Sequence, residues 1–475
     1  MKVNITPNQK KDWLIIFFVL DTTDLALYLN DIYAELEKTK LRKTTSIYVL
    51  KDTIQRIHHP EKFVQFGLEI YGFEYDEACK KTKRINVDIA EVDKKDGNAW
   101  KESIIQLYKI TNATFNTLIT WSHGMAIAIA NINPPSKNNF QILRNDRISL
   151  TNPGCDVIQA DIFENAVVVA TDDSACAQID TLFVSEIANS LQAIVRQNKF
   201  DMIIMCNCYM NTLDNCYNLK DITNYYVASA TMIKLKGFDF KSLVKQLNNP
   251  LNLGDLVSPG KFFPGFLGWL HYKKLIRVKG PLYNIYMRSI IKNLLTGYEK
   301  NNTDTKENAT IVASNLNQAS EIMVLLNNLA NYMIRNKDIV YPALIRLINN
   351  RKVLINEYFL INILDLLKQL SLELNCNEFE KYRIEHENFL LKLMLTDKII
   401  MLESGPQASQ ILNKKGNLYS LYLPLTTRRI KNVFECEYWR TNIRNSSFSK
   451  ETSWDNLVRD FVEWQRLNLS ITKKE

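Results

Sequence analysis

Cysteine and long apolar runs are both scarce in this sequence. Only 8 of the 475 residues are cysteine, far fewer than a disulfide-stapled scaffold requires. No stretch reaches the roughly 18 apolar residues that span a bilayer. The apolar run Leu14–Leu20 near the start is short, and no small-residue cleavage site follows it, which argues against a signal peptide. We therefore expect a cytoplasmic protein with free thiols and no membrane insertion.

A strong excess of charge of one sign is also absent. The 59 Lys and Arg residues face 51 Asp and Glu residues, which gives a net charge of +8. The basic residues are interspersed with acidic ones, as on an ordinary solvated surface, whereas a nucleic-acid binder concentrates them on one face. We expect no nucleic-acid partner, and sharply salt-dependent retention on DNA would contradict this expectation.

The first half of the chain alternates apolar strand-like runs with amphipathic helical stretches. Strands alternating with helices predict a mostly parallel α/β sheet with right-handed crossovers and helices on its faces. Helices are expected at Asp96–Ile110 and Asp180–Gln197. The runs that favour strands include Trp13–Leu20, Thr45–Leu50, Phe115–Trp121, Ala126–Ile132, Phe200–Met205 and Tyr225–Ala228.

The composition changes along the chain and suggests two domains. Residues 1–245 carry the strand–helix alternation, interrupted at 131–176 by a loop-rich insert with several Pro, Asn and Asp residues. Long inserts in compact domains are often functional. Residues 246–475 favour helices, including 313–336, 357–374, 382–395 and 454–467, with one late strand near 418–423. The length allows about two or three domains.

Two of the expected strands end in reactive side chains. One is followed by His123 and Gly124, and the other by Cys206-Asn207-Cys208. Because sites form at the carboxyl ends of parallel strands, His123 and Cys208 can lie side by side, where imidazole activates a thiol. A helix beginning near Asn211 would lower the pKa of Cys208 through its dipole. The backbone N–H groups of Gly124 and Cys208 could form an oxyanion hole.

Plainer interpretations of the same residues stay open at this point. A histidine at a strand end, or a cysteine after an apolar strand, is commonly structural. A zinc site could draw on Cys206, Cys208, Cys216 and His123. The cysteine spacing matches no standard zinc module and Cys216 falls in an expected helix, so we expect no metal.

Six blocks, taken in order, match one known family and cover nearly the whole chain: Asp12–Leu25, Ile119–Gly124, Phe200–Leu213, Val227–Ser229 with Gly237-Phe238, Leu418–Pro424 and Thr452–Asp455. Together they resemble the clostripain-like cysteine peptidases, which are relatives of caspases, gingipains and legumain. The His-Gly and Cys blocks are fairly specific, and the C-terminal blocks are weak singly but support the set.

The resemblance implies a caspase-like fold and peptide hydrolysis through an acyl-enzyme thioester. It assigns His123 as the base, Cys208 as the nucleophile and Gly124 to the oxyanion hole. Family members are often zymogens that cut themselves after the His block, which corresponds here to the insert at 131–176. Some members respond to calcium, but no calcium-loop spacing is visible here, so we expect no cofactor.

The substrate pocket is where the sequence departs from the family. Basic-specific members carry an aspartate two residues before the nucleophile, and Cys206 stands there in this chain. A second acidic pocket position aligns near Lys236, and Ser229 lies in the neighbouring block. A pocket without a carboxylate cannot offset the desolvation of a guanidinium. We predict an apolar P1 residue, or an acidic one if Lys236 points inward, and not Arg or Lys.

The expected cytoplasmic location suggests regulated, limited proteolysis of a protein partner. The resemblance offers one precedent, the caspase-like peptidases encoded beside bacterial gasdermins in antiphage systems. The alternative is a catalytically inactive relative whose helical C-terminal half serves protein–protein interaction. The ambiguity between Cys206 and Cys208, together with the altered pocket, keeps this alternative in view, while the retention of both His123 and Cys208 argues against it.

Overall fold

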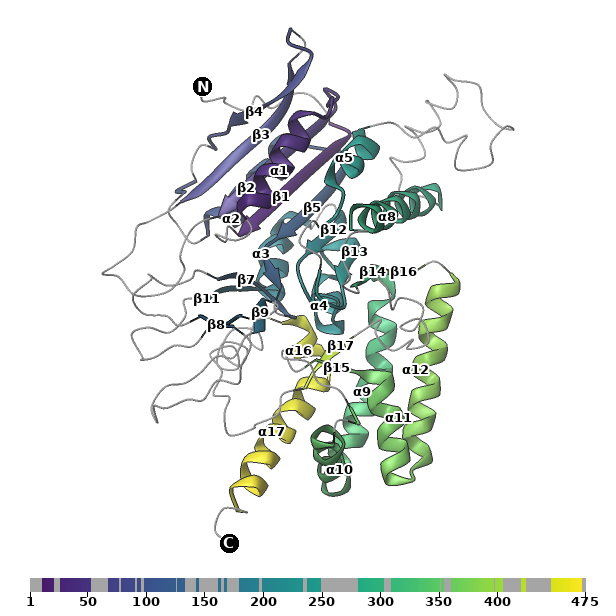
Figure 1. The fold of residues 1–475 in the computed structure, drawn as a ribbon. Coiled ribbons are helices and arrows are strands. Elements are labelled where there is room, and N and C mark those ends of the chain that lie inside the picture. Colours follow the sequence, from purple (N-terminus) through teal and green to yellow (C-terminus); the bar gives the residue numbers. More distant parts are fainter. Residues whose placement is uncertain are drawn as a thin grey trace.

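A computed structural model gives the fold of the chain (Figure 1). It describes residues 11–20, 26–52, 67–76, 78–89, 92–94, 98–124, 126–132, 142–144, 161–163, 166–168, 179–195, 199–233, 237–248, 281–302, 309–350, 352–353, 360–396, 398–404, 420–423 and 446–471. Most of the insert and the expected pocket residue Lys236 lie outside these ranges. No helix among the described residues has the length and apolar character needed to cross a membrane.

One nine-stranded sheet organises the molecule. Its five central strands run parallel: β13 (Thr223–Ser229), β12 (Phe200–Cys206), β5 (Phe115–Trp121), β1 (Trp13–Leu20) and β2 (Thr45–Asp52). Two further strands flank them on each side, and both of the joins to the parallel core are antiparallel. These are β3 (Leu68–Asp76) and β4 (Lys81–Asn86) at one edge, and β14 (Ala309–Asn315) and β16 (Ile399–Ser404) at the other. The predicted mostly parallel α/β fold is confirmed.

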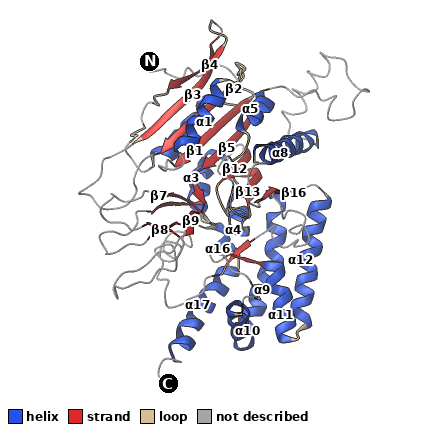
Figure 2. Cartoon of the chain, viewed as in Figure 1, coloured by secondary structure: helices blue, strands red, loops and turns tan. Residues whose placement is uncertain are grey.

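Both faces of the sheet are covered, because alternate side chains of each strand enter separate hydrophobic cores. In β1, Leu14, Ile16 and Phe18 pack into one core and Ile15 and Phe17 into the other. The first core also contains residues of α2 (Ala99–Thr111), α3 (Val184–Val195) and α4 (Leu213–Leu219). The second contains residues of α1 (Ala26–Glu37), α5 (Phe240–Asn248) and α8 (Pro281–Asn301). Figure 2 shows these helices on the two sides of the strands.

The second half of the chain is largely helical, as the sequence predicts, but it also completes the main sheet through β14 and β16. The boundary expected at 245/246 therefore marks a change in composition and not a break in the sheet. Besides α8, the helices described in this half are α9 (Ala319–Arg335), α10 (Lys337–Asn349), α11 (Ile363–Leu374), α12 (Asn377–Leu395), α16 (Ser447–Glu451) and α17 (Trp454–Ile471). The late strand lies at β17 (Ser420–Tyr422) and pairs with β15 (Leu360–Asn362).

Three predicted helices are wrong at their first residues. The stretch expected to be helical from Asp180 begins as strand β11 (Ile179–Phe183), and α3 starts only at Val184. Strand β11 pairs antiparallel with β7 (Ala128–Ile132). Likewise, the start of the helix expected at 313–336 belongs to strand β14, and the helix expected at 357–374 is preceded by strand β15 and starts only at Ile363. In all three cases a neighbouring strand supplies hydrogen bonds that local periodicity cannot reveal.

The described parts of the 131–176 insert include three short antiparallel strands, β8 (Ile142–Arg144), β9 (Asp161–Phe163) and β10 (Ala166–Val168). The two ends of the insert are held together by the β7–β11 ladder, in which Ile132 pairs with Ile179. The insert therefore leaves and re-enters the domain at one place.

Candidate active site

The sheet brings His123 and Cys208 to the same side of the molecule, at the carboxyl ends of two central strands. Strands β5 and β12 are parallel neighbours, and in their register Trp121 lies opposite Cys206. His123 comes two residues after Trp121, and Cys208 comes two residues after Cys206. Both side chains are half-buried, as a group that must meet a substrate requires.

Gly124 provides direct contact between the two strand ends. A Cβ atom at this position would overlap the backbone nitrogen and carbonyl oxygen of Cys208. Any other residue would therefore push the two segments apart. The two-residue strand β6 (His123–Gly124) is fixed from its other side by β7, where His123 pairs with Ala130 and Gly124 with Ile129.

The loop after β12 is tied down by the loop that follows β13. The Cys208 Sγ atom accepts a hydrogen bond from the backbone N–H of Ile233 at 3.3 Å. The next residue, Tyr209, has a φ of 58°, a left-handed conformation that is costly for a large side chain. Its N–H donates to the carbonyl oxygen of Thr231 at 2.9 Å. This sharp turn shapes the chain immediately after the thiol.

The following helix begins later than the sequence predicts. Helix α4 starts at Leu213, and the side chain of Thr212 caps it by accepting a hydrogen bond from the N–H of Asn215. The expected start near Asn211 is therefore two residues too early. That the helix dipole lowers the pKa of Cys208 stays a prediction.

Burial distinguishes the two cysteines of the Cys-Asn-Cys sequence. Cys206 is 1% exposed, and burial raises the pKa of its thiol to about 12, although the backbone N–H of Phe238 opposes this shift. Gly237, with a φ of 57°, covers it: a Cβ there would lie 3.0 Å from the Cys206 Sγ. Cys208 is only half-buried. The neutral, enclosed Cys206 thiol is a poor nucleophile.

The other expected pocket residues lie behind the surface or outside the described ranges. Ser229 is fully buried at the end of β13, where its hydroxyl donates to the carbonyl oxygen of Thr310 at 3.2 Å and accepts from the N–H of Thr231. Cys206 and Ser229 can therefore influence a substrate pocket only indirectly, by packing behind the residues that line it. Lys236 lies outside the described residues.

The residues considered for zinc are not brought together. Cys206 belongs to one hydrophobic core and Cys216 to the core on the opposite face of the sheet. Within the described ranges, no group of three or more His, Cys, Asp or Glu side chains is arranged to hold a metal ion.

Sequence reasoning missed two buried asparagines beside the catalytic candidates. Asn207 and Asn215 are both fully enclosed, and their amides bond to the chain around His123 and Cys208. For Asn207 the available signal was its place directly after the apolar run Met202–Cys206 of β12, where a buried amide must find hydrogen-bond partners.

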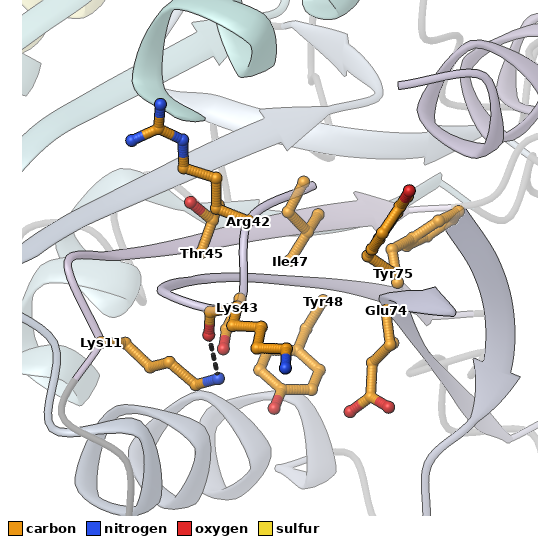
Figure 3. Close-up of a pocket in the computed structure, with 11 residues that line it drawn as sticks. Lys11, Arg42, Lys43, Thr45, Ile47, Tyr48, Glu74 and Tyr75 are labelled. Atoms are coloured by element: carbon orange, nitrogen blue, oxygen red, sulfur yellow. Dashed lines mark hydrogen bonds between the residues drawn. The ribbon is translucent and has the colours of Figure 1, made fainter. Parts of the chain in front are cut away.

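A cavity of about 190 Å³ lies away from this site, where β1 and β2 begin. Figure 3 shows its lining, in which the Lys11 ammonium donates to the carbonyl oxygen of Lys43 at 2.5 Å. None of the predicted site residues lines it. Parallel strands present their functional groups at their carboxyl ends. This cavity lies at the amino ends of β1 and β2, opposite to the strand ends that carry His123 and Cys208.

A model of the clostripain family matches residues 160–464. The chain belongs to this family and is a cysteine endopeptidase. The matched range contains Cys208 and begins after His123, so the position of the histidine rests on the strand register described above.

The chain is similar to solved structures at low sequence identity. An inactive zymogen C11 protease from Parabacteroides distasonis is 12% identical, with a TM-score of 0.50, over 92% of this chain and 99% of the other. A secreted C11 cysteine protease from Bacteroides thetaiotaomicron, in complex with an irreversible peptide inhibitor, is 11% identical over 94% of this chain and 99% of the other, with a TM-score of 0.47. No curated protein matches the chain.

Proposed function

We propose that Cys208 and His123 form the catalytic dyad of this endopeptidase. The observation that carries the proposal is their placement two residues beyond the paired positions Cys206 and Trp121 on adjacent parallel strands. The contact of Gly124 with the Cys208 backbone supports it, because it brings close together the two backbones whose N–H groups we assign to the oxyanion hole.

The chemistry assigned to these groups is acyl transfer. The Cys208 thiolate adds to the scissile carbonyl carbon, and the N–H groups of Gly124 and Cys208 stabilise the resulting oxyanion. The His123 imidazolium gives its proton to the departing amine as the C–N bond breaks, which leaves a thioester on Cys208. His123 then takes a proton from water, the hydroxide displaces the thiolate, and the acid product leaves.

Intact-mass analysis and peptidase assays of purified wild type, Cys208→Ala and His123→Ala test the dyad. We expect peptide hydrolysis and self-cleavage in the wild type and in the control Cys79→Ala, which removes an exposed thiol, but in neither of the two dyad variants. Activity in Cys208→Ala would overturn the assignment. If the wild type folds but cleaves no peptide, the result would favour the alternative of a catalytically inactive protein that serves protein–protein interaction.

We also propose that the P1 residue is not Arg or Lys. Cys206 stands where basic-specific relatives carry a carboxylate, and its thiol is neutral because burial raises its pKa to about 12. Leaving a P1 guanidinium without an anionic partner costs on the order of several kcal/mol. Fluorogenic peptides that differ only at P1 test this, with apolar and acidic residues preferred. Rapid cleavage after Arg would contradict it.

Activation by a cut in the insert, followed by limited proteolysis of a partner inside the cell, completes the proposal. Its support is the β7–β11 ladder, which holds both ends of the insert beside the site. A co-encoded bacterial gasdermin is the partner we propose. Incubation of such a candidate with the wild type, and with Cys208→Ala as control, tests it. If the candidate gasdermin stays intact after incubation with active enzyme, the proposed gasdermin partner would be wrong.

A further inference from the structure

We propose that Asn207 and Asn215 form a two-amide clamp that sets the spacing of His123 and Cys208. The inference rests on the proposed dyad and deepens it by naming its positioning residues. Both asparagines are 0% exposed, so neither contacts a substrate. They act through the segments that they join.

Asn207 joins the two strand ends from the cysteine side. Its Oδ1 accepts a hydrogen bond from the Thr120 hydroxyl at 2.6 Å. Its Nδ2 donates to the carbonyl oxygen of Ser122 at 2.7 Å and to the Ser122 hydroxyl at 3.0 Å. Ser122 directly precedes His123, and Asn207 directly precedes Cys208. One amide therefore fixes the residues adjoining both catalytic groups.

Asn215 joins the same two segments further along the chain. Its Nδ2 donates to the carbonyl oxygen of Ala126, just after the His-Gly strand, and to that of Met210, just after Cys208, each at 2.7 Å. Tyr226 reinforces this point, since its hydroxyl also donates to the Met210 carbonyl oxygen at 2.7 Å. The two amides thus bracket the dyad, one on each side of it along the chain.

Geometry explains why amides suit this position. An amide carries two N–H donors and one accepting oxygen, so a single asparagine can join groups of different segments in a buried setting. Asn207 uses both its oxygen and its nitrogen, whereas Asn215 joins Ala126 and Met210 through its Nδ2 alone, because its Oδ1 has no hydrogen-bond partner among the described residues. The clamp leaves the chemistry to Cys208 and His123. Its loss would let their spacing drift, and a displacement of about 1 Å can lower a rate about 100-fold.

The test compares Asn207→Ala, Asn215→Ala and Thr120→Val in the full chain. Thr120→Val keeps the shape of the side chain but removes the hydroxyl that binds Asn207, and Thr120→Ser should restore it. Two readouts are used: kcat and KM for peptide hydrolysis, and the pH profile of Cys208 alkylation by iodoacetamide. Asp76→Ala is the control, because it removes two hydrogen bonds to the backbone N–H groups of Ala78 and Cys79 in the turn between β3 and β4, the two strands at one edge of the main sheet.

We expect the three clamp variants to lose kcat by about 10- to 100-fold with little change in KM. Their alkylation profile should move toward that of an ordinary thiol, because the thiolate–imidazolium pair is weakened. Asp76→Ala should lose thermal stability alone. Folded variants that keep the wild-type profile and kcat would overturn the clamp. A wild type whose Cys208 shows no imidazole-dependent reactivity would overturn the proposed dyad, and the clamp with it.

Discussion

At the scale of single residues, burial sets the chemistry of otherwise identical side chains. Cys206 and Cys208 are two positions apart at the end of β12, yet Cys206 is enclosed and burial raises its pKa to about 12, whereas Cys208 is half-buried. Asn207 between them points its amide at the neighbouring strand end. Sequence patterns place all three residues at a strand terminus. They do not say which side chain faces the core, because that depends on Gly237 and Phe238, which come from a distant turn.

The two thiols should therefore differ sharply toward a small alkylating reagent. At pH 7.5 the wild type should be modified by iodoacetamide at Cys208, while Cys206 stays unmodified until the protein is denatured, because a buried neutral thiol is both inaccessible and protonated. Peptide mapping by mass spectrometry measures this. Cys216, which is also buried with a raised pKa, is the internal control. Modification of Cys206 in the native protein would contradict the assignment of the nucleophile.

A buried carboxyl group makes a second residue-scale prediction. Asp214 in α4 is 2% exposed, and burial, reinforced by the nearby Asp455 carboxyl, raises its pKa well above the usual value. When the pKa of a carboxyl is higher in the folded state than in the unfolded state, folding becomes less favourable as pH rises between these two pKa values. Asp214→Asn keeps the shape, and its Oδ1 can still accept from Asn218.

Asp214→Asn should therefore raise the melting temperature at pH 8 by a few degrees and change it little at pH 4. Scanning calorimetry of wild type and variant across this range measures the difference. Asp221→Asn is the exposed control on the same segment and should show no such trend. A variant that is less stable than the wild type at pH 8 would show that Asp214 is ionised in the folded protein.

At the scale of elements, the strands buried on both faces are the predictable ones. Trp13–Leu20 and Phe115–Trp121 were predicted with their observed bounds, because continuous apolar runs suit central parallel strands. Strands β11, β14 and β15 were missed, since each comes shortly before an amphipathic helix and only a partner strand decides where the helix begins. The dyad was predicted from such strand ends, whereas its asparagine clamp depends on side-chain contacts between segments.

The C-terminal segment 446–451 packs on helix α4, which follows the nucleophile. Asn218 in α4 accepts hydrogen bonds from the Ser446 hydroxyl at 3.0 Å and the N–H of Phe448 at 3.2 Å. Tyr217 donates to the Glu451 carboxylate at 2.5 Å. These contacts couple the end of the chain to the segment that holds Asn215.

Removing the Asn218 amide should release this coupling. Asn218→Ala leaves a buried hydroxyl and a buried N–H without their acceptor, which costs about 1–3 kcal/mol per unsatisfied group. Denaturant unfolding should show a loss of that order. Glu451→Gln is the contrasting variant, because its partly exposed pairing with Lys220 is worth only about 0–1 kcal/mol. Equal losses in the two variants would show that the buried amide has no special role.

At the scale of the whole molecule, a cut in the insert divides the main sheet between two fragments. The N-terminal fragment would hold β1 to β5 and the C-terminal fragment β12 to β16, so the division falls between β5 and β12 in the middle of the sheet. That border is paired from Met202 to Cys206, with apolar side chains buried on both faces. The ladder between β7 and β11 adds a second link.

The cut chain should therefore remain one particle. A site for a sequence-specific protease, placed between Ser136 and Asn139 in the Cys208→Ala variant, makes the cut independent of self-cleavage. After digestion we expect two bands under denaturing conditions but a single native species with the mass of the intact chain, because separating the fragments would expose the centre of both hydrophobic cores. Native mass spectrometry and size-exclusion chromatography measure this, with the undigested variant as control. Fragments that separate without denaturant would show that the β5–β12 border alone cannot hold the sheet together.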